Sequence, residues 1–151
     1  MRVLVLDDDA LTAFTLLRLF AVRGIQVVSV STVEAAEKAI GAERFDALLV
    51  DTQADQTDGA RLFARARELH PGISLFLVSD RKQPANRDNA DIYYIEKPWD
   101  GFFVVDIVRA RCAGEPITAG ASGRLRTQDD RPTINIRPIR SRRISAESTA
   151  G

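Results

Sequence analysis

The stretch VLVLDDD, residues 3–9, places four consecutive aliphatic side chains directly before three aspartates. A second aliphatic run at 47–50 (ALLV) ends in the same way at Asp51. Unbroken runs rich in valine and leucine are typical of strands buried on both faces of a parallel sheet. If the two strands lie side by side, their carboxyl ends bring Asp7, Asp8 and Asp51 into one crevice, where open α/β sheets bind their ligands.

Such a crevice would hold several carboxylates close together. Packed carboxylates repel one another, and burying them without partners costs free energy. A cluster of this kind therefore indicates a site for a hard cation such as Mg²⁺, which prefers oxygen ligands. Asp9 stands where the next helix should begin, so we assign it to the helix N-cap rather than to the metal.

Composition sets broad limits on the class of protein. With 151 residues, 45% of them hydrophobic, the chain is expected to form one compact core. The formal net charge is zero, so bulk attraction to nucleic acid or membrane is not indicated. Cys112 is the only cysteine, which excludes an internal disulfide, and no apolar stretch is long enough to span a bilayer. These features, with no signal peptide at the start, predict a cytoplasmic protein.

Strand and helix patterns alternate along the chain and predict an α/β fold with a doubly wound, five-stranded parallel sheet. Short apolar or β-branched runs predict strands at 3–6, 25–30, 45–50, 73–78 and 92–95. Between the last two strands, residues 81–91 (RKQPANRDNAD) lack the apolar stripe that a helix covering a sheet needs. We therefore expect the fourth helix to be missing or stunted.

The helices are predicted from apolar spacing and from capping residues. The first helix should bury a stripe formed by Leu11, Phe14, Leu17 and Ala21, and the second should begin with a capping box of Ser31 and Glu34. The third should follow Asp58-Gly59, and the last should run to about Cys112.

Four motifs at the predicted strand ends resemble one known family. They are LVLDDD at 4–9, LLVDTQADQTDG at 48–59, FLVSD at 76–80 and IEKPW at 95–99. Their order and spacing, from Met1 to about Cys112, resemble the receiver domain of two-component response regulators. The resemblance implies a flavodoxin-like receiver fold and a phosphorelay function.

The resemblance also implies a role for each site residue. Asp51 would accept the phosphoryl group. Lys97 would bind a phosphoryl oxygen, Ser79 would donate its hydroxyl to the same group, and Tyr94 would change rotamer in the switch. Asp7, Asp8, Asp51 and the backbone carbonyl of Gln53 would hold Mg²⁺. The implied partners are a sensor histidine kinase or a phosphotransfer protein and a downstream protein target.

Two departures from the family pattern lead to alternative hypotheses. Asp80 stands where a small residue is expected, and the loop at 54–57 is polar. A degenerate receiver that binds a partner without phosphorylation is therefore one alternative. The pair Asp7-x-Asp9 also faintly resembles haloacid-dehalogenase-type phosphatases, but Leu11 occupies the place where that family needs threonine or valine. We expect a self-phosphorylating switch rather than a turnover enzyme.

The last part of the chain, residues 113–151, differs from the rest in composition. Residues 1–112 carry a net charge of −3 and residues 113–151 a net charge of +3, with seven arginines between Arg124 and Arg143. This segment is too short and too polar for an output domain with its own core, and no DNA-binding element is visible in it. We predict a receiver domain at 1–112 and a disordered basic tail at 113–151, with a docking strand or a weak anion-binding segment as the alternatives for the tail.

Overall fold

The computed structural model describes residues 1–51, 56–80 and 92–115, except for the side chains of residues 56–58. In these ranges five strands form a single sheet in the order β2-β1-β3-β4-β5, and every neighbouring pair is parallel. The strands are β1 (Arg2–Leu6), β2 (Gln26–Val30), β3 (Ala47–Asp51), β4 (Ser74–Ser79) and β5 (Ile92–Glu96). The predicted five-stranded parallel α/β fold is confirmed.

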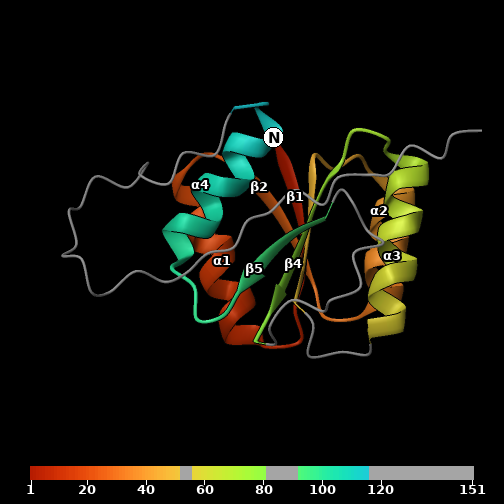
Figure 1. Cartoon of the computed structure of the whole chain (residues 1–151), viewed down its shortest axis with the longest axis horizontal. Coiled ribbons are helices and arrows are strands. Elements are labelled where there is room, and N and C mark those ends of the chain that lie inside the picture. Colours follow the sequence, from red (N-terminus) through yellow and green to blue (C-terminus); the bar gives the residue numbers. More distant parts are fainter. Residues whose placement is uncertain (52–55, 81–91, 116–151) are drawn as a thin grey trace, which may run out of the picture.

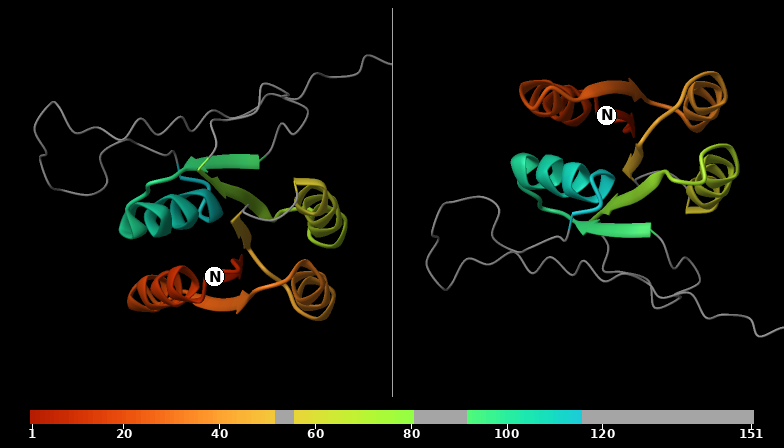
Figure 2. Two further views of the ribbon diagram at one scale, coloured as in Figure 1. Left: turned by 90° about the horizontal axis from the view of Figure 1, so that it is seen from below. Right: turned by 90° about the horizontal axis from the view of Figure 1, so that it is seen from above.

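Two layers of helices cover the sheet (Figure 1, Figure 2). The described helices are α1 (Ala10–Val22), α2 (Val33–Ala42), α3 (Gln56–Leu69) and α4 (Gly101–Cys112), with α1 and α4 on one face and α2 and α3 on the other. None of these helices is long and apolar enough to cross a membrane. The expected absence of a helix at 81–91 and the tail from residue 116 onward lie outside the described residues.

Each face of the sheet has its own hydrophobic core. Phe20 and Phe76 are fully buried between the sheet and the pair α1 and α4. Leu48 and Leu62 are fully buried on the opposite face, under α2 and α3. All five residues of β3 are buried, as expected for a central strand whose aliphatic run contributes to both cores.

The face that α1 buries differs from the predicted one. The helix buries Ala13, Leu16 and Phe20, whereas Leu11 is 73% exposed and Phe14 is 59% exposed. The predicted stripe was wrong because ALTAFTLLRLFAV has apolar residues around most of the helix. Helical spacing then fits two stripes, and contact with α4 and the sheet decides between them.

Helix starts were predicted with mixed success. Asp9 caps α1 as predicted, and its side chain accepts hydrogen bonds from two backbone N–H groups of the first turn. The N-cap of α2 is Thr32 rather than Ser31, because two good capping residues stand side by side and Glu34 is one residue too close to complete the box. Helix α3 begins at Gln56, before Gly59, since a helix interior tolerates one glycine at a cost of about 1 kcal/mol.

Candidate functional site

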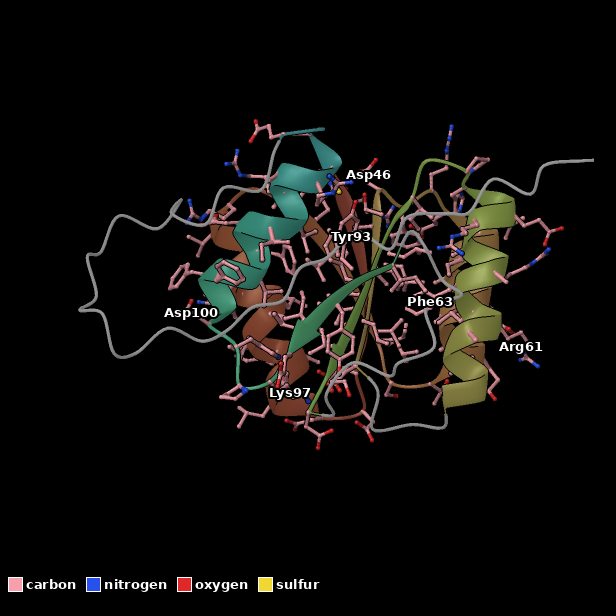
Figure 3. The ribbon with its side chains drawn as sticks, viewed as in Figure 1. Asp46, Arg61, Phe63, Tyr93, Lys97 and Asp100 are labelled. Atoms are coloured by element: carbon pink, nitrogen blue, oxygen red, sulfur yellow. The ribbon has the colours of Figure 1, made fainter. Side chains whose placement is uncertain are left out.

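The strand register collects polar side chains at the carboxyl edge of the sheet. Leu6 of β1 pairs with Val50 of β3, so the residues that follow, Asp7 and Asp51, lie at the same level. On the neighbouring strands Ser79 pairs with Glu96, which places Lys97 one residue beyond. Figure 3 shows Lys97 at this edge of the sheet. The edge therefore brings together Asp7, Asp51, Ser79 and Lys97.

Asp51 and Lys97 form an ion pair at the centre of this edge. The Nζ atom of Lys97 lies 2.5 Å from Oδ2 of Asp51, and the Asp51 side chain is only 6% exposed. The other carboxylate oxygen, Oδ1, is buried and has no hydrogen-bond partner in the described part of the chain. One oxygen is thus neutralised by the lysine, while the second is buried without a partner among the described residues.

Asp7 is the second buried carboxylate of the site. It is 4% exposed, and its Oδ1 accepts a hydrogen bond of 2.8 Å from the backbone N–H of Asp9. Burial raises the pKa of Asp7 above its usual value, and the nearby charge of Asp51 raises it further, although the Asp9 N–H bond acts in the opposite direction. The ionised form of Asp7 is therefore disfavoured by its surroundings until a positive charge joins it.

Asp8 and the carbonyl of Gln53 are the other two metal ligands that the sequence suggests. Asp8 is exposed at the mouth of the site, and Gln53 lies outside the described residues. No three acidic, histidine or cysteine side chains converge on a metal position within the described ranges. The buried, unpartnered Asp51 Oδ1 and the charge-strained Asp7 nevertheless provide hard oxygen donors of the kind that fits Mg²⁺.

Ser79 and Tyr94 lie on the two strands beyond Asp51. Ser79 is 4% exposed, and its backbone carbonyl accepts a 2.9 Å hydrogen bond from the N–H of Lys97. This bond ties the lysine-bearing segment to the end of β4. Tyr94 is 7% exposed, and its hydroxyl is buried without a hydrogen-bond partner among the described residues. A rotamer change that moves the hydroxyl to a polar partner would therefore remove an unfavourable burial.

Trp99 is a further neighbour of the site. Its ring packs at the start of α4, where a Cβ on Gly101 would lie 3.5 Å from it. It also lines a small cavity together with Asp7, Asp51 and Leu16. The available signal was its position two residues beyond Lys97, at the end of a strand that leads into the site.

Replacing Asp7 with asparagine should stabilise the protein in the absence of metal. A carboxyl group whose pKa is raised by folding adds stability below its unfolded pKa, and that stability is lost as the pH rises through the folded pKa. At pH 7.5 the ionised Asp7 side chain therefore lowers the stability of the fold. Asparagine removes the charge and keeps an oxygen that accepts the hydrogen bond from the N–H of Asp9. We expect the melting temperature to rise by a few degrees in EDTA.

The melting-temperature measurement has a control variant and can be repeated as a function of pH. Asp8→Asn changes an exposed carboxylate and should leave the melting temperature in EDTA nearly unchanged. The advantage of Asp7→Asn should disappear as the pH falls below the ordinary aspartate value of 3.8, because Asp7 is then protonated in both states. An equal effect of both variants at pH 7.5 would contradict the proposed strain at Asp7.

A parallel sheet with this strand order is that of a doubly wound α/β protein. Such proteins bind ligands where the strand order reverses, and the carboxylates at the ends of β1 and β3 lie at that place. The response regulator receiver domain family matches residues 3–105, and the chain belongs to this family. Comparison with curated protein sequences gives no significant match.

Solved structures show the same fold. A CheY-like response regulator receiver domain protein from Methanospirillum hungatei superposes with a TM-score of 0.67 at 23% identity, covering 75% of this chain and 94% of that one. The receiver domain of the hybrid histidine kinase CckA gives a TM-score of 0.60 at 22% identity, covering 74% and 99%. A transiently phosphorylated switch of bacterial signal transduction gives 0.60 at 22% identity, covering 75% and 94%.

Family membership decides between the broad classes of function. A receiver domain is a phosphorelay signalling switch rather than a turnover enzyme, and it implies a histidine kinase as partner. The phosphatase alternative is further weakened by Asp9, whose carboxylate oxygens accept hydrogen bonds from Leu11 and Thr12 at the start of α1. No DNA-binding domain is found in the part of the chain that the structure describes.

Proposed function

We propose that the protein is phosphorylated on Asp51 by a sensor histidine kinase or a phosphotransfer protein, with Mg²⁺, and that it signals by contacts with other proteins. The observation that carries this proposal is the ion pair between Asp51 and Lys97 beside the buried Asp7. In a receiver domain this is the arrangement expected of a nucleophilic carboxylate, a cation for the incoming phosphoryl group and a metal ligand.

In the proposed reaction a carboxylate oxygen of Asp51 attacks the phosphorus of a phosphohistidine. The P–N bond breaks, the imidazole leaves, and an acyl phosphate forms on Asp51. Lys97 exchanges its contact with Asp51 for one with a phosphoryl oxygen, which its flexible side chain and compact charge allow. The buried hydroxyl of Ser79 donates a hydrogen bond to another phosphoryl oxygen.

Metal binding completes the proposed site. Asp7, Asp8, Asp51 and the backbone carbonyl of Gln53 would hold Mg²⁺, which offsets the repulsion between the acidic cluster and the phosphoryl group. The raised pKa of Asp7 supports this assignment, because a bound cation relieves the strain of keeping its carboxylate ionised. Asp8, exposed at the mouth, would turn inward to complete the set.

The proposed output follows from the new charge at Asp51. A phosphoryl group adds roughly −1.5 to −2 charges at neutral pH, at a position that is buried in the unphosphorylated protein. Ser79 and Tyr94 would respond to this charge, and Tyr94 has a buried, unpartnered hydroxyl that a new rotamer can satisfy. A change at β4 and β5 would then alter the surface that a partner protein contacts.

Treatment with acetyl phosphate and Mg²⁺, followed by intact-mass measurement, tests this proposal. We expect the wild type to gain the mass of one phosphoryl group, EDTA to prevent the gain, and Asp51→Asn to show none. Asp46→Asn is a matched control, because Asp46 is an exposed aspartate at the other end of β3, and it should be labelled like the wild type.

The degenerate-receiver alternative makes the opposite prediction. Asp80 is exposed directly beside Ser79, where its charge opposes an incoming phosphoryl group. Absence of labelling in the wild type, recovered by Asp80→Ala, would show that Asp80 has ended phosphorylation. Absence of labelling in both proteins would contradict the proposal altogether.

A further inference from the structure

A groove with a volume of about 430 Å³ opens beside the site, between the start of α1, the end of β2 and the first turn of α2. Phe14 and Leu17 of α1 form its apolar wall, together with Val30 of β2. The charged residues among those described along its lining are Asp7 and Asp8, and both are acidic. The groove is therefore suited to a chain segment with apolar side chains followed by basic ones.

The groove lies at the carboxyl end of β2, which is the outer strand of the sheet. Among the described strands β2 pairs with β1 alone, and Figure 2 shows it at the rim between α1 and α2. The N–H of Gln26 donates to the carbonyl of Met1, just before β1, and the carbonyl of Val30 accepts from the N–H of Asp7, just after β1. Because alternate residues of a strand point to opposite sides, the backbone groups of Val27 and Ser29 point toward the outer edge. An exposed edge of this kind accepts an added strand.

The chain itself contains a segment of matching chemistry. Residues 133–137 (TINIR) alternate polar and apolar side chains, as a strand with one apolar face does. Pro132 and Pro138 bracket the segment, and its five residues equal the length of β2. Arg137 ends it, and further arginines follow within a segment (113–151) of net charge +3. The apolar residues of this segment thus precede its positive charge, which is the order that the apolar wall and the acidic end of the groove require.

The position at which the chain leaves the domain makes a parallel alignment possible. The Sγ of Cys112, at the end of α4, donates to the carbonyl of Asp46 just before β3. The chain therefore departs at the amino edge of the sheet, where a strand parallel to β2 must begin. Residues 116–132 span up to about 56 Å when extended, whereas a domain of this size has a radius of gyration of about 13 Å. The connection also exceeds the dozen residues that a parallel crossover needs.

We propose that residues 133–137 bind along the outer edge of β2, parallel to it, as an intramolecular docking segment. Ile136 occupies the apolar groove beside Ser29 and Val30, Ile134 lies two residues earlier along the edge of β2, and Arg137 lies beside Asp8 at the acidic end of the groove. The bound segment covers the exposed apolar surface at the start of α1 and places a positive charge at the mouth of the site. This inference goes beyond the proposed function and does not depend on phosphorylation.

Hydrogen–deuterium exchange of the full chain at low ionic strength, without phosphodonor, tests the docking. In the double variant Ile134→Asp/Ile136→Asp we expect the amides of Val27 and Ser29 to exchange roughly five- to thirtyfold faster than in the wild type, the effect of losing a contact of ordinary strength. Ile144→Asp is the matched control, because it changes an isoleucine of the same tail outside the segment and should leave the exchange unchanged.

Two further arms separate this docking from other occupants of the groove. Protection of Val27 and Ser29 should be independent of protein concentration and should weaken with added salt, since salt screens the contact between Arg137 and Asp8. Protection that rises with concentration would assign the groove to a second copy of the chain and overturn the proposal. Equal exchange in the wild type and the double variant would overturn it as well.

Discussion

Replacing Lys97 with alanine should slow the phosphorylation of Asp51 by about a hundredfold, the usual effect of removing one group that stabilises charge in a transition state. Lys97 Nζ lies 2.5 Å from Asp51 Oδ2 and is held at that edge by the backbone bond from its N–H to Ser79. Without the Lys97 ammonium, no cation of the protein offsets the repulsion between the carboxylates of the site and an incoming phosphoryl oxygen. Intact-mass measurement over time with acetyl phosphate and Mg²⁺ gives the rate.

A second lysine variant makes this result specific. Lys38→Ala removes an exposed lysine from α2, away from the strand ends, and should leave the rate unchanged. Lys97→Arg keeps the charge but replaces a compact ammonium with a larger planar group, so we expect a partial loss. Equal rates for Lys97→Ala and the wild type would show that the ion pair has a structural role alone.

Replacing Phe20 with alanine should lower the free energy of unfolding by about 3–5 kcal/mol, the usual cost of removing a fully buried phenylalanine. Phe20 is 0% exposed in the core between α1, the sheet and α4. Since small domains are stable by only about 5–15 kcal/mol, the variant should be close to unfolded at moderate urea concentrations. Urea denaturation followed by circular dichroism measures the change.

Phe14 provides the matched control on the same helix. It is 59% exposed, and Phe14→Ala should change the free energy of unfolding by less than about 1 kcal/mol. The two substitutions remove the same atoms, so their difference reports burial alone. Similar losses for both would mean that α1 is rotated relative to its described position.

The sheet and the candidate site were predictable because both follow from local patterns. Unbroken aliphatic runs indicate buried parallel strands, and parallel strands bring their carboxyl ends to one edge. Asp7 and Asp51 end such runs, so their convergence required no knowledge of helix packing. Lys97 needed the family resemblance as well, because a lysine at a strand end has no special meaning by itself. The metal and phosphoryl roles of these residues stay predictions until they are measured.

Features that depend on contacts between elements were not predictable in the same way. The buried side of α1 was assigned wrongly because the helix is apolar on more than one side and α4 selects among them. His70, the residue that directly follows α3, is a second example. Nothing local showed that it would be buried with its ring Nε2 3.0 Å from the carbonyl of Ile40.

The position of Trp99 gives the protein an optical reporter. Trp99 is the only tryptophan in the chain, and it shares a small cavity with Asp7 and Asp51. The fluorescence of this indole therefore originates beside the cavity that Asp7 and Asp51 also line. Binding of a metal ion or phosphorylation there can be followed continuously in unlabelled protein by fluorescence spectroscopy.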